Sequence, residues 1–167
     1  MLITVPNPIL RHKAVPATTK LDLSNITEEM SRVRQENGGI GLAAPQIGQS
    51  VRIINIIYRG KEYTIFNPYI QHKKGAVKMF EGCLSVPDGI YQVTRPQTLT
   101  LFGEDAHGRP IKLKCKTPEE ASVAEHEVDH LDGILIDKKG VFWSPKINSI
   151  NREKLAFGDE SRDTYER

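Results

Sequence analysis

The stretch that organises this sequence is TPEEASVAEHEVDHLDG, residues 117–133, which carries the signals of a complete helix. Thr117 is suited to the N-cap, Pro118 to the first helical position and Glu120 to the third, so the start matches a capping box. Gly133 ends the helix, because glycine readily adopts the left-handed conformation that follows a last turn. An apolar stripe at helical spacing predicts its buried side: Ala121, Ala124, Val128 and Leu131.

Two histidines in this helix indicate a metal site. His126 and His130 are four residues apart, so both imidazoles lie on one face and can bind one ion. Glu127, between them, is placed to handle a proton on water bound to that ion. The alternative is a surface helix with two solvated histidines. We favour it less, because the histidines share their side with Val123, whereas a solvated face would carry Lys and Glu.

The first half of the chain predicts one helix and one hairpin. Asn25 can cap a helix that ends at the glycines of residues 38–39. Residues 51–57 are nearly all apolar and rich in β-branched side chains, which favours a strand. A second strand-like run, residues 62–66, follows a turn at residues 59–60. This pattern predicts a β-hairpin.

The second half predicts further short strands. Residues 98–102 and 111–115 both alternate between apolar and polar side chains, with a turn at residues 104–108 between them. Cys115 falls on the apolar face and is expected to be a buried strand residue. Residues 134–136 are expected to form a last short strand. The fold class is therefore α+β, with short antiparallel strands packed around a central helix carrying the HExxH motif and with an early N-terminal helix.

We find no repeat, low-complexity segment or linker that divides the chain. We expect one catalytic domain over residues 1–140 and a C-terminal extension over residues 141–167. In the extension, residues 141–143 offer an apolar contact, and a weak helix is predicted over residues 144–157. Residues 158–167 are charged and polar enough that we expect disorder.

Composition excludes several classes of protein. The chain has 167 residues and a formal net charge of +2, with no long block of like charge, so we expect no nucleic-acid binding of its own. No apolar run approaches the ~18 residues of a membrane span, and residues 1–6 lack the features of a signal peptide. Only Cys83 and Cys115 are present, which favours a reducing compartment. We expect a cytoplasmic protein without membrane contact.

A catalytic metal site usually has three protein ligands and one open position, so the two histidines need a partner. A downstream Glu would indicate a thermolysin-like peptidase, a third His another zincin, and a Cys thiolate a rarer site. Cys83 is the strongest candidate for the third ligand, because Gly82 and Leu84 flank it in an order that packing does not require.

Three motifs together resemble those of the peptide deformylase family, in the family's order. They are GIGLAAPQ at residues 39–46, EGCLS at residues 81–85 and HEVDH at residues 126–130. Three separated motifs in order are far more specific than any one of them. The resemblance extends over about residues 1–140 and does not include the tail.

The resemblance implies a hydrolase that removes the N-formyl group from the N-terminal formylmethionine of new polypeptides and releases formate. It implies one divalent metal ion bound by Cys83, His126 and His130. Fe(II) is the family's usual physiological metal, with Zn(II), Ni(II) or Co(II) as substitutes. Imidazole and thiolate suit several such metals, so the sequence does not choose among them. Candidates for orienting these ligands by hydrogen bonds are Asp129, Glu81 and Arg95.

The resemblance also implies roles at the reaction centre. Glu127 would act as the general base and return the proton to the leaving amine. The Gln46 side-chain amide and the Leu84 backbone N–H would donate to the developing oxyanion. Taken alone, the glycine-rich run that precedes Gln46 could be a simple turn and Gln46 a satisfied surface amide.

Substrate contacts follow from the same resemblance. Ile40 and Gly41 would let an extended substrate backbone approach and form hydrogen bonds, and Val123 would contribute to the methionine pocket. The implied partners are formylated N-termini of nascent peptides, with a transient association with the ribosome.

The chain departs from the family pattern at several positions. Glu125 stands where many members have Gln, and Ile90 stands where many bacterial members have Arg near the substrate. Glu119 and Ser122 stand where the methionine pocket usually has apolar residues. The chain after residue 140 does not clearly match the C-terminal helix of common bacterial enzymes, so ribosome docking through that helix does not carry over.

Two other functions remain open from the sequence. A zincin-type metallopeptidase would use the same helix with a third ligand after His130, and the downstream carboxylates are Asp132, Asp137, Glu153 and Glu160. A non-enzymatic metal-binding module is the second alternative. Glu127 and Gln46 argue against it, because a purely structural site would fill its fourth position with another protein ligand.

Overall fold

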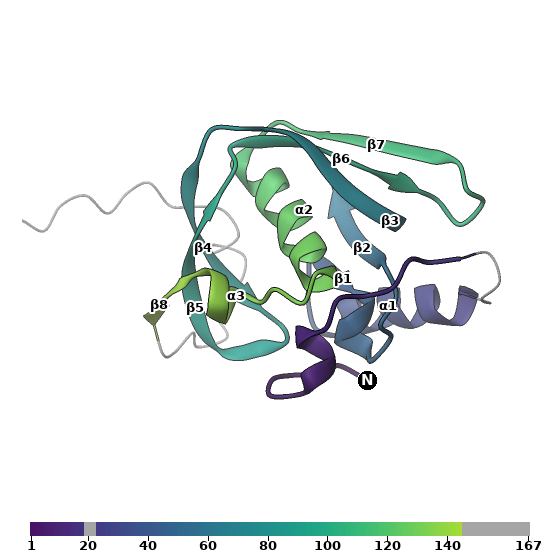
Figure 1. Cartoon of the computed structure of the whole chain (residues 1–167), viewed down its shortest axis with the longest axis horizontal. Coiled ribbons are helices and arrows are strands. Elements are labelled where there is room, and N and C mark those ends of the chain that lie inside the picture. Colours follow the sequence, from purple (N-terminus) through teal and green to yellow (C-terminus); the bar gives the residue numbers. More distant parts are fainter. Residues whose placement is uncertain (19–22, 145–167) are drawn as a thin grey trace, which may run out of the picture.

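The computed structural model describes residues 1–18 and 23–144, which form two antiparallel sheets with helix α2 (Pro118–Leu131) packed against strands of both (Figure 1). The larger sheet has the order β1 (Gly41–Ala43), β2 (Ile53–Tyr58), β3 (Lys61–Lys74), β6 (Thr98–Glu104), β7 (Pro110–Cys115). The smaller sheet has the order β4 (Val77–Cys83), β5 (Val86–Arg95), β8 (Val141–Ser144). The predicted α+β class is confirmed.

Helix α2 begins and ends as its sequence predicts. Oγ of Thr117 accepts a hydrogen bond from the backbone N–H of Glu120 at 3.3 Å. The Glu120 carboxylate in turn accepts from the backbone N–H of Lys116 at 2.7 Å. After Leu131, Gly133 adopts a φ of 72°, and a Cβ there would lie 2.5 Å from the carbonyl oxygen of Arg11. Only glycine fits this turn without displacing the backbone.

The predicted apolar stripe of α2 packs on the larger sheet. Ala121, Ala124, Val128 and Leu131 are all buried and belong to one cluster with Ile54, Ile56, Ile65, Leu101 and Leu113. Cys115 is in the same cluster and is 2% exposed, as predicted for an inward strand residue. This packing fixes the height and rotation of the helix that carries the two histidines.

The predicted hairpin is confirmed and is longer than expected. Tyr58 pairs with Lys61 across a two-residue turn in which Arg59 and Gly60 have φ values of 51° and 75°, the positive angles of a tight hairpin turn. β3 continues to Lys74 because it leaves β2 and pairs with β6 beyond a register shift. Asn67, with a φ of 47°, lies at that shift, which explains why the alternation did not extend past residue 66.

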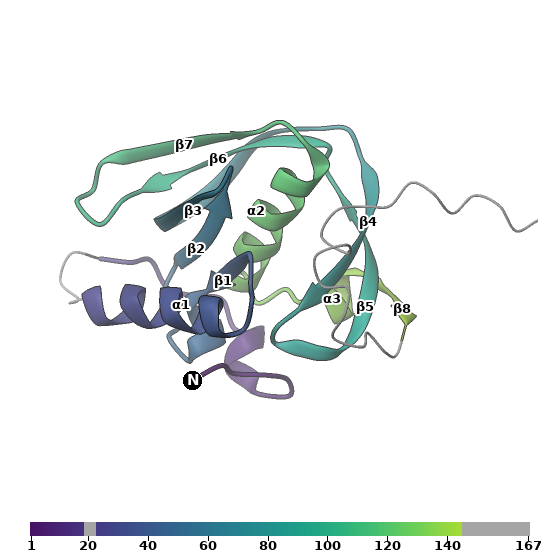
Figure 2. The same ribbon diagram turned by 180° about the vertical axis from the view of Figure 1, so that it is seen from behind.

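Helix α1 (Ser24–Glu36) is also present, but its start differs from the prediction. Leu23 is the N-cap and makes no side-chain capping bond, so Asn25 lies inside the first turn. At the other end Asn37 caps the helix and Gly38 has a φ of 62°. Two short 3-10 helices, η1 (Pro8–Arg11) and η2 (Ala44–Ile47), complete this half of the chain (Figure 2).

The last short strand predicted at residues 134–136 is wrong. The chain instead forms a one-turn helix, α3 (Ile136–Lys139), in which the backbone N–H groups of Lys139 and Gly140 donate to Leu135 and Ile136. Leu135 and Ile136 are buried beside β4 and β5, so their apolar character reflects packing under a turn rather than a strand.

The hairpin of β4 and β5 was not predicted, because the glycines and proline between residues 82 and 89 interrupt the alternation. Residues 141–143 were expected to make an apolar contact, and they form most of β8, which pairs with β5. Ser144 ends β8, and the rest of the predicted helix over residues 144–157 lies outside the described residues, as do residues 158–167. No helix in the described ranges has the length and apolar character needed to cross a bilayer.

Candidate active site

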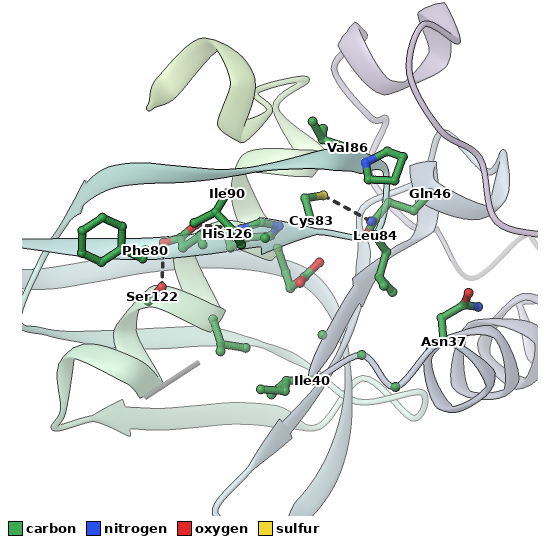
Figure 3. Close-up of a pocket in the computed structure, with 18 of the residues that line it drawn as sticks. Asn37, Ile40, Gln46, Phe80, Cys83, Leu84, Val86, Ile90, Ser122 and His126 are labelled. Carbon is green, nitrogen blue, oxygen red and sulfur yellow. Dashed lines mark hydrogen bonds and ion pairs between the residues drawn. The ribbon is translucent and has the colours of Figure 1, made fainter. Parts of the chain in front are cut away.

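Three segments that are distant in the sequence meet at one cavity of about 430 Å³ (Figure 3). They are the glycine-rich residues that enter β1, the turn between β4 and β5, and one side of α2. α2 makes this possible because it contacts β1 on one side and the smaller sheet on the other. The predicted site residues among the cavity lining are Ile40, Gly41, Gln46, Cys83, Leu84, Val123, His126 and Glu127.

Cys83, His126 and His130 offer three ligand atoms within 4.8 Å of one another. Nε2 of His130 lies 3.3 Å from Sγ of Cys83 and 3.2 Å from Nε2 of His126. These two separations are hydrogen-bond distances, and three metal-ligating atoms this close together can also share one ion. A sulfur with two imidazoles matches the ligand set of a catalytic site that keeps an open position.

Two buried polar atoms in the described part of the chain have no hydrogen-bond partner, and both belong to this helix. They are Oε2 of Glu127 and Nδ1 of His130. An unpartnered buried oxygen costs free energy unless a ligand or solvent molecule meets it. Glu127 and His126 line the cavity side by side. This arrangement fits a site that receives an ion and a reacting group.

Glu81 orients the first histidine. Nδ1 of His126 lies 2.9 Å from Oε2 of Glu81, which leaves Nε2 directed toward the sulfur and the second imidazole. The Ser122 hydroxyl donates to Oε1 of Glu81 at 2.7 Å. A carboxylate that holds the outer nitrogen of a metal-binding histidine fixes both its ring orientation and its tautomer.

Arg95, with a side chain that is 0% exposed, holds Glu81 in turn. Its guanidinium donates to both oxygens of Glu81, at 2.7 and 2.8 Å, and to Oδ2 of Asp129 at 2.5 Å. The sequence-based suggestion that Glu81, Arg95 and Asp129 orient the ligands is consistent with this network. The planar guanidinium is suited to such paired contacts, because it donates in a fixed fork.

Charges in this network shift the ionisation of its members. Burial opposes ionisation of Glu81, but hydrogen bonds from Arg95 and His126 outweigh it and hold the pKa of Glu81 well below its usual range. Burial also opposes protonation of His126, yet contacts with Cys83 and Glu81 raise its pKa. The pKa of His130 is lowered by burial and by the neighbouring His126. A neutral imidazole is the form that binds metals.

Glu127 has a different environment from Glu81. Its carboxylate faces the cavity and lies against the backbone of Gly41, where a Cβ would be 2.3 Å from Oε1. Burial raises the pKa of Glu127 to about 7, and the nearby carboxylates of Glu81 and Asp129 act in the same direction, against the opposing charges of His126 and Arg95. A carboxyl group that titrates near neutrality is suited to accept and return a proton.

Gln46 is buried at 2% exposure, so it is not a surface amide. Its Oε1 accepts from the backbone N–H of Ala43 at 2.8 Å, and its Nε2 donates to Oγ of Ser85 at 3.1 Å. The first bond fixes the amide so that its NH₂ group lies 3.9 Å from Sγ of Cys83. Sequence reasoning did not identify Ser85, although it belongs to the EGCLS motif.

Glu125, where the family pattern has Gln, is turned away from the cavity. Its carboxylate pairs with Nζ of Lys73 at 2.5 Å and with Nη1 of Arg95 at 3.3 Å, and Lys139 lies 3.8 Å away. Its charge is therefore balanced outside the cavity. Ser122 and Glu119 do line the cavity, and the hydroxyl of Ser122 is occupied by Glu81.

The downstream carboxylates that a zincin would need are engaged elsewhere. Asp132 pairs with Arg52 at 2.7 Å, and Asp137 pairs with Arg11. Within residues 1–18 and 23–144, the group of His, Cys and acidic residues close enough to hold an ion is Cys83, His126 and His130. Glu153 and Glu160 lie outside these ranges.

Comparison with known proteins agrees with this geometry. A family model described as polypeptide deformylase matches residues 1–146. The chain belongs to the peptide deformylase family. A peptide deformylase from Dictyoglomus turgidum is 38% identical over 139 residues, which cover 82% of this chain and 90% of that protein. One from Dehalococcoides mccartyi is 39% identical over 137 residues, covering 78% and 80% of the two chains.

Solved structures of this family have the same fold. A peptide deformylase from Legionella pneumophila superposes with a TM-score of 0.79 at 32% identity, covering 87% of this chain and 86% of that one. A class I type b peptide deformylase from Acinetobacter baumannii, bound to Met-Ala-Ser, has a TM-score of 0.77 at 28% identity, covering 83% and 96%. The resemblance of the three sequence motifs to this family is therefore confirmed.

Proposed function

We propose that this chain hydrolyses the N-formyl amide of formylmethionine at the N-terminus of newly made polypeptides and releases formate. The observation that carries the proposal is the buried, unpartnered Oε2 of Glu127, which lines a cavity beside the Cys83, His126 and His130 group. Membership of the peptide deformylase family supports the substrate class.

The proposed metal ligands are Cys83, His126 and His130. A divalent ion held there supplies Lewis acidity toward the formyl carbonyl and lowers the pKa of water. We propose Fe(II) as the physiological ion, on the resemblance to the family, with Zn(II), Ni(II) or Co(II) as functional substitutes. The mixed thiolate and imidazole donors are compatible with each of these metals.

Glu127 is the proposed proton carrier. Water adds to the formyl carbon, and the Glu127 carboxylate accepts the proton that the water loses. When the carbon–nitrogen bond breaks, Glu127 returns that proton to the amine nitrogen, so the products are formate and a free α-amino group. A pKa of about 7 lets the same group act in both directions near neutral pH.

Gln46 and Leu84 are the proposed donors to the oxyanion that develops during addition. The Gln46 amide is held by Ala43 and Ser85, so its NH₂ group is oriented before substrate binds. Leu84 lies in the turn after Cys83 and lines the cavity. Loss of one such donor typically lowers the rate about 10²- to 10³-fold.

The substrate is proposed to lie extended along Ile40 and Gly41, with the methionine side chain near Val123. Gly41 lines the cavity and has no side chain, and the Glu127 carboxylate packs where its Cβ would lie, so the substrate backbone would run beside the proposed base. Ser122 does not present a free hydroxyl to the methionine, since that hydroxyl donates to Glu81.

The proposed cellular location and partner follow from the substrate. Formylated N-termini occur on chains as they are made, so we propose cytoplasmic action with transient association with the ribosome. We also propose that residues 1–140 form the catalytic domain and that residues 141–167 are an extension of it.

The test is formate release from formyl-Met-Ala-Ser by protein purified without oxygen, with metal content measured in the same samples. We expect turnover by the metal-loaded protein and a loss of about 10²- to 10⁴-fold in Glu127→Gln, which keeps size and metal but cannot accept the proton. Cleavage at internal peptide bonds would instead indicate a metallopeptidase. Absence of both activities in fully loaded protein would indicate a binding module.

A further inference from the structure

Strand β8 places two aromatic side chains on opposite faces of the smaller sheet. Trp143 packs on Phe80 of β4, with ring centroids 4.7 Å apart, whereas Phe142 packs on Tyr91 of β5, with centroids 5.5 Å apart. Tyr91 pairs with Glu81, the neighbour of Phe80, so Phe80 and Tyr91 face opposite ways. Trp143 is therefore on the same face as Phe80.

The Phe80 face is continuous with the cavity. Phe80 and Ile90 both line it, and they come from the two strands that flank the Cys83 turn. Trp143 extends this apolar lining outward, since it contacts Phe80 and remains 63% exposed. We call Phe80, Ile90 and Trp143 the aromatic ledge. A large exposed indole adjoining an apolar cavity is a feature of binding surfaces rather than of ordinary solvated edges.

We propose that the aromatic ledge binds an apolar side chain in the residues that follow formylmethionine, so that this enzyme prefers nascent chains with apolar second or third residues. The inference rests on the proposed function and adds a preference to it. The occupant follows from continuity, because an extended peptide leaving the cavity past Phe80 meets Trp143 next. Extended peptides point alternate side chains to one side, which allows one of them to reach the ledge.

Trp143 is the single tryptophan of the chain, so its fluorescence reports on the ledge alone. The first experiment titrates metal-loaded protein with the product-like peptides Met-Leu-Phe and Met-Ala-Ser. We expect a saturable blue shift with Met-Leu-Phe and tighter binding of that peptide by about three- to tenfold, the usual effect of one interface aromatic. Emission that does not respond to Met-Leu-Phe at saturation would overturn the proposal.

The second experiment compares kcat/KM for formyl-Met-Leu-Phe and formyl-Met-Ala-Ser in variants. Trp143→Ala is expected to bring the ratio of the two values toward one, through KM of the apolar peptide. Phe142→Ala is the matched control, because it removes a neighbouring exposed aromatic from the other face and should keep the wild-type ratio. Trp143→Phe, which retains a ring, should restore most of the preference.

Other results separate the alternatives. If Trp143→Ala raises KM equally for both peptides, the indole only supports the cavity wall, and the proposal is wrong. If emission shifts with protein concentration and sedimentation shows a dimer, the aromatic ledge binds a second copy of the chain. That result would also overturn the proposal. The fluorescence titration does not depend on turnover. A protein that binds Met-Leu-Phe at Trp143 but releases no formate would therefore contradict the proposed function, whereas peptide binding at the aromatic ledge would still be supported.

Discussion

The carboxylate of Glu127 occupies the space where a side chain on Gly41 would begin. A Cβ at Gly41 would lie 2.3 Å from Oε1 and 2.8 Å from Cγ of Glu127. Gly41 is on β1 and Glu127 on α2, so this contact joins the strand proposed to hold the substrate to the proposed base. The absence of a side chain at residue 41 therefore sets the position of the carboxylate.

Gly41→Ala is expected to displace the Glu127 carboxylate and to lower formate release by at least about tenfold, because a misplaced general base loses much of its contribution. Overpacking should also destabilise the fold by about 1–3 kcal/mol. Steady-state kinetics and urea unfolding measure the two effects. In a Glu127→Ala background the alanine has room, so Gly41→Ala should cost little stability there. Equal destabilisation in both backgrounds would contradict the proposed clash.

Cys83→Ser is expected to lose bound metal and activity together, because the thiolate is the metal-binding form of cysteine and serine is a poor alkoxide donor at neutral pH. Metal analysis after gel filtration and formate release measure the two losses. Cys115→Ala is the control, since Cys115 is buried in the core away from the cavity. It should retain full metal content, and a Cys83→Ser protein that does so as well would place the third ligand elsewhere.

Arg95→Met should leave Glu81 buried without its cation, which typically destabilises a protein by about 3–5 kcal/mol. Because Glu81 also orients His126, metal affinity should fall by about 10- to 100-fold. Denaturant unfolding and competition with a chelator test both values. Arg95→Lys should restore little of the lost stability and metal affinity, since lysine cannot donate to both oxygens of Glu81 as the guanidinium does. Arg109→Met, which breaks an exposed pair with Asp105, provides a control that should change neither property.

The ion pair of Asp137 with Arg11 ties α3 to the N-terminal segment and predicts acid sensitivity. The hydrogen bond from Arg11 lowers the pKa of Asp137 in the folded state, so the unfolded chain binds the proton more readily. Stability from this pair is therefore present above the unfolded pKa, about 3.9, and is lost as pH falls through the lower folded value.

Asp137→Asn should accordingly reduce the free energy of unfolding at neutral pH and flatten its decline below about pH 4, where the wild-type pair is lost. Urea unfolding across this pH range measures the difference. Asp88→Asn is the control, because Asp88 is exposed and forms no ion pair within the described ranges. A wild-type profile unchanged by Asp137→Asn would show that the pair contributes nothing to acid stability.

Elements with strong local signals were predictable from the sequence. The N-cap at Thr117, the glycine at residue 133 and the stripe between them define α2, and the turn at Arg59 defines the first hairpin. Each signal acts within a few residues, through capping bonds, positive φ angles or the period of burial. The N-cap of α1 was predicted wrongly at Asn25, because a competent capping residue does not cap when the chain enters the helix two residues earlier.

Longer-range features depended on the packed structure. The apolar run at residues 134–136 looked like a strand, but Ile134 is exposed, Leu135 caps α3 and only Ile136 lies in that helix, because apolar character alone does not distinguish a strand from the start of a helical turn. The pair of Glu125 with Lys73 and the contact of Trp143 with Phe80 join residues 52 and 63 positions apart. No periodicity in the sequence encodes which surfaces meet across two sheets.

The sequence by itself determined that two imidazoles and a carboxylate share one helix, since helical geometry relates residues four apart whatever surrounds them. It also indicated the family, through three motifs in order. Only the tertiary structure brought Cys83 to within 3.3 Å of His130, 47 residues away, and buried Arg95 among three carboxylates. Those contacts exist because α2 is packed between two sheets, and its depth is fixed by side chains contributed from the whole chain.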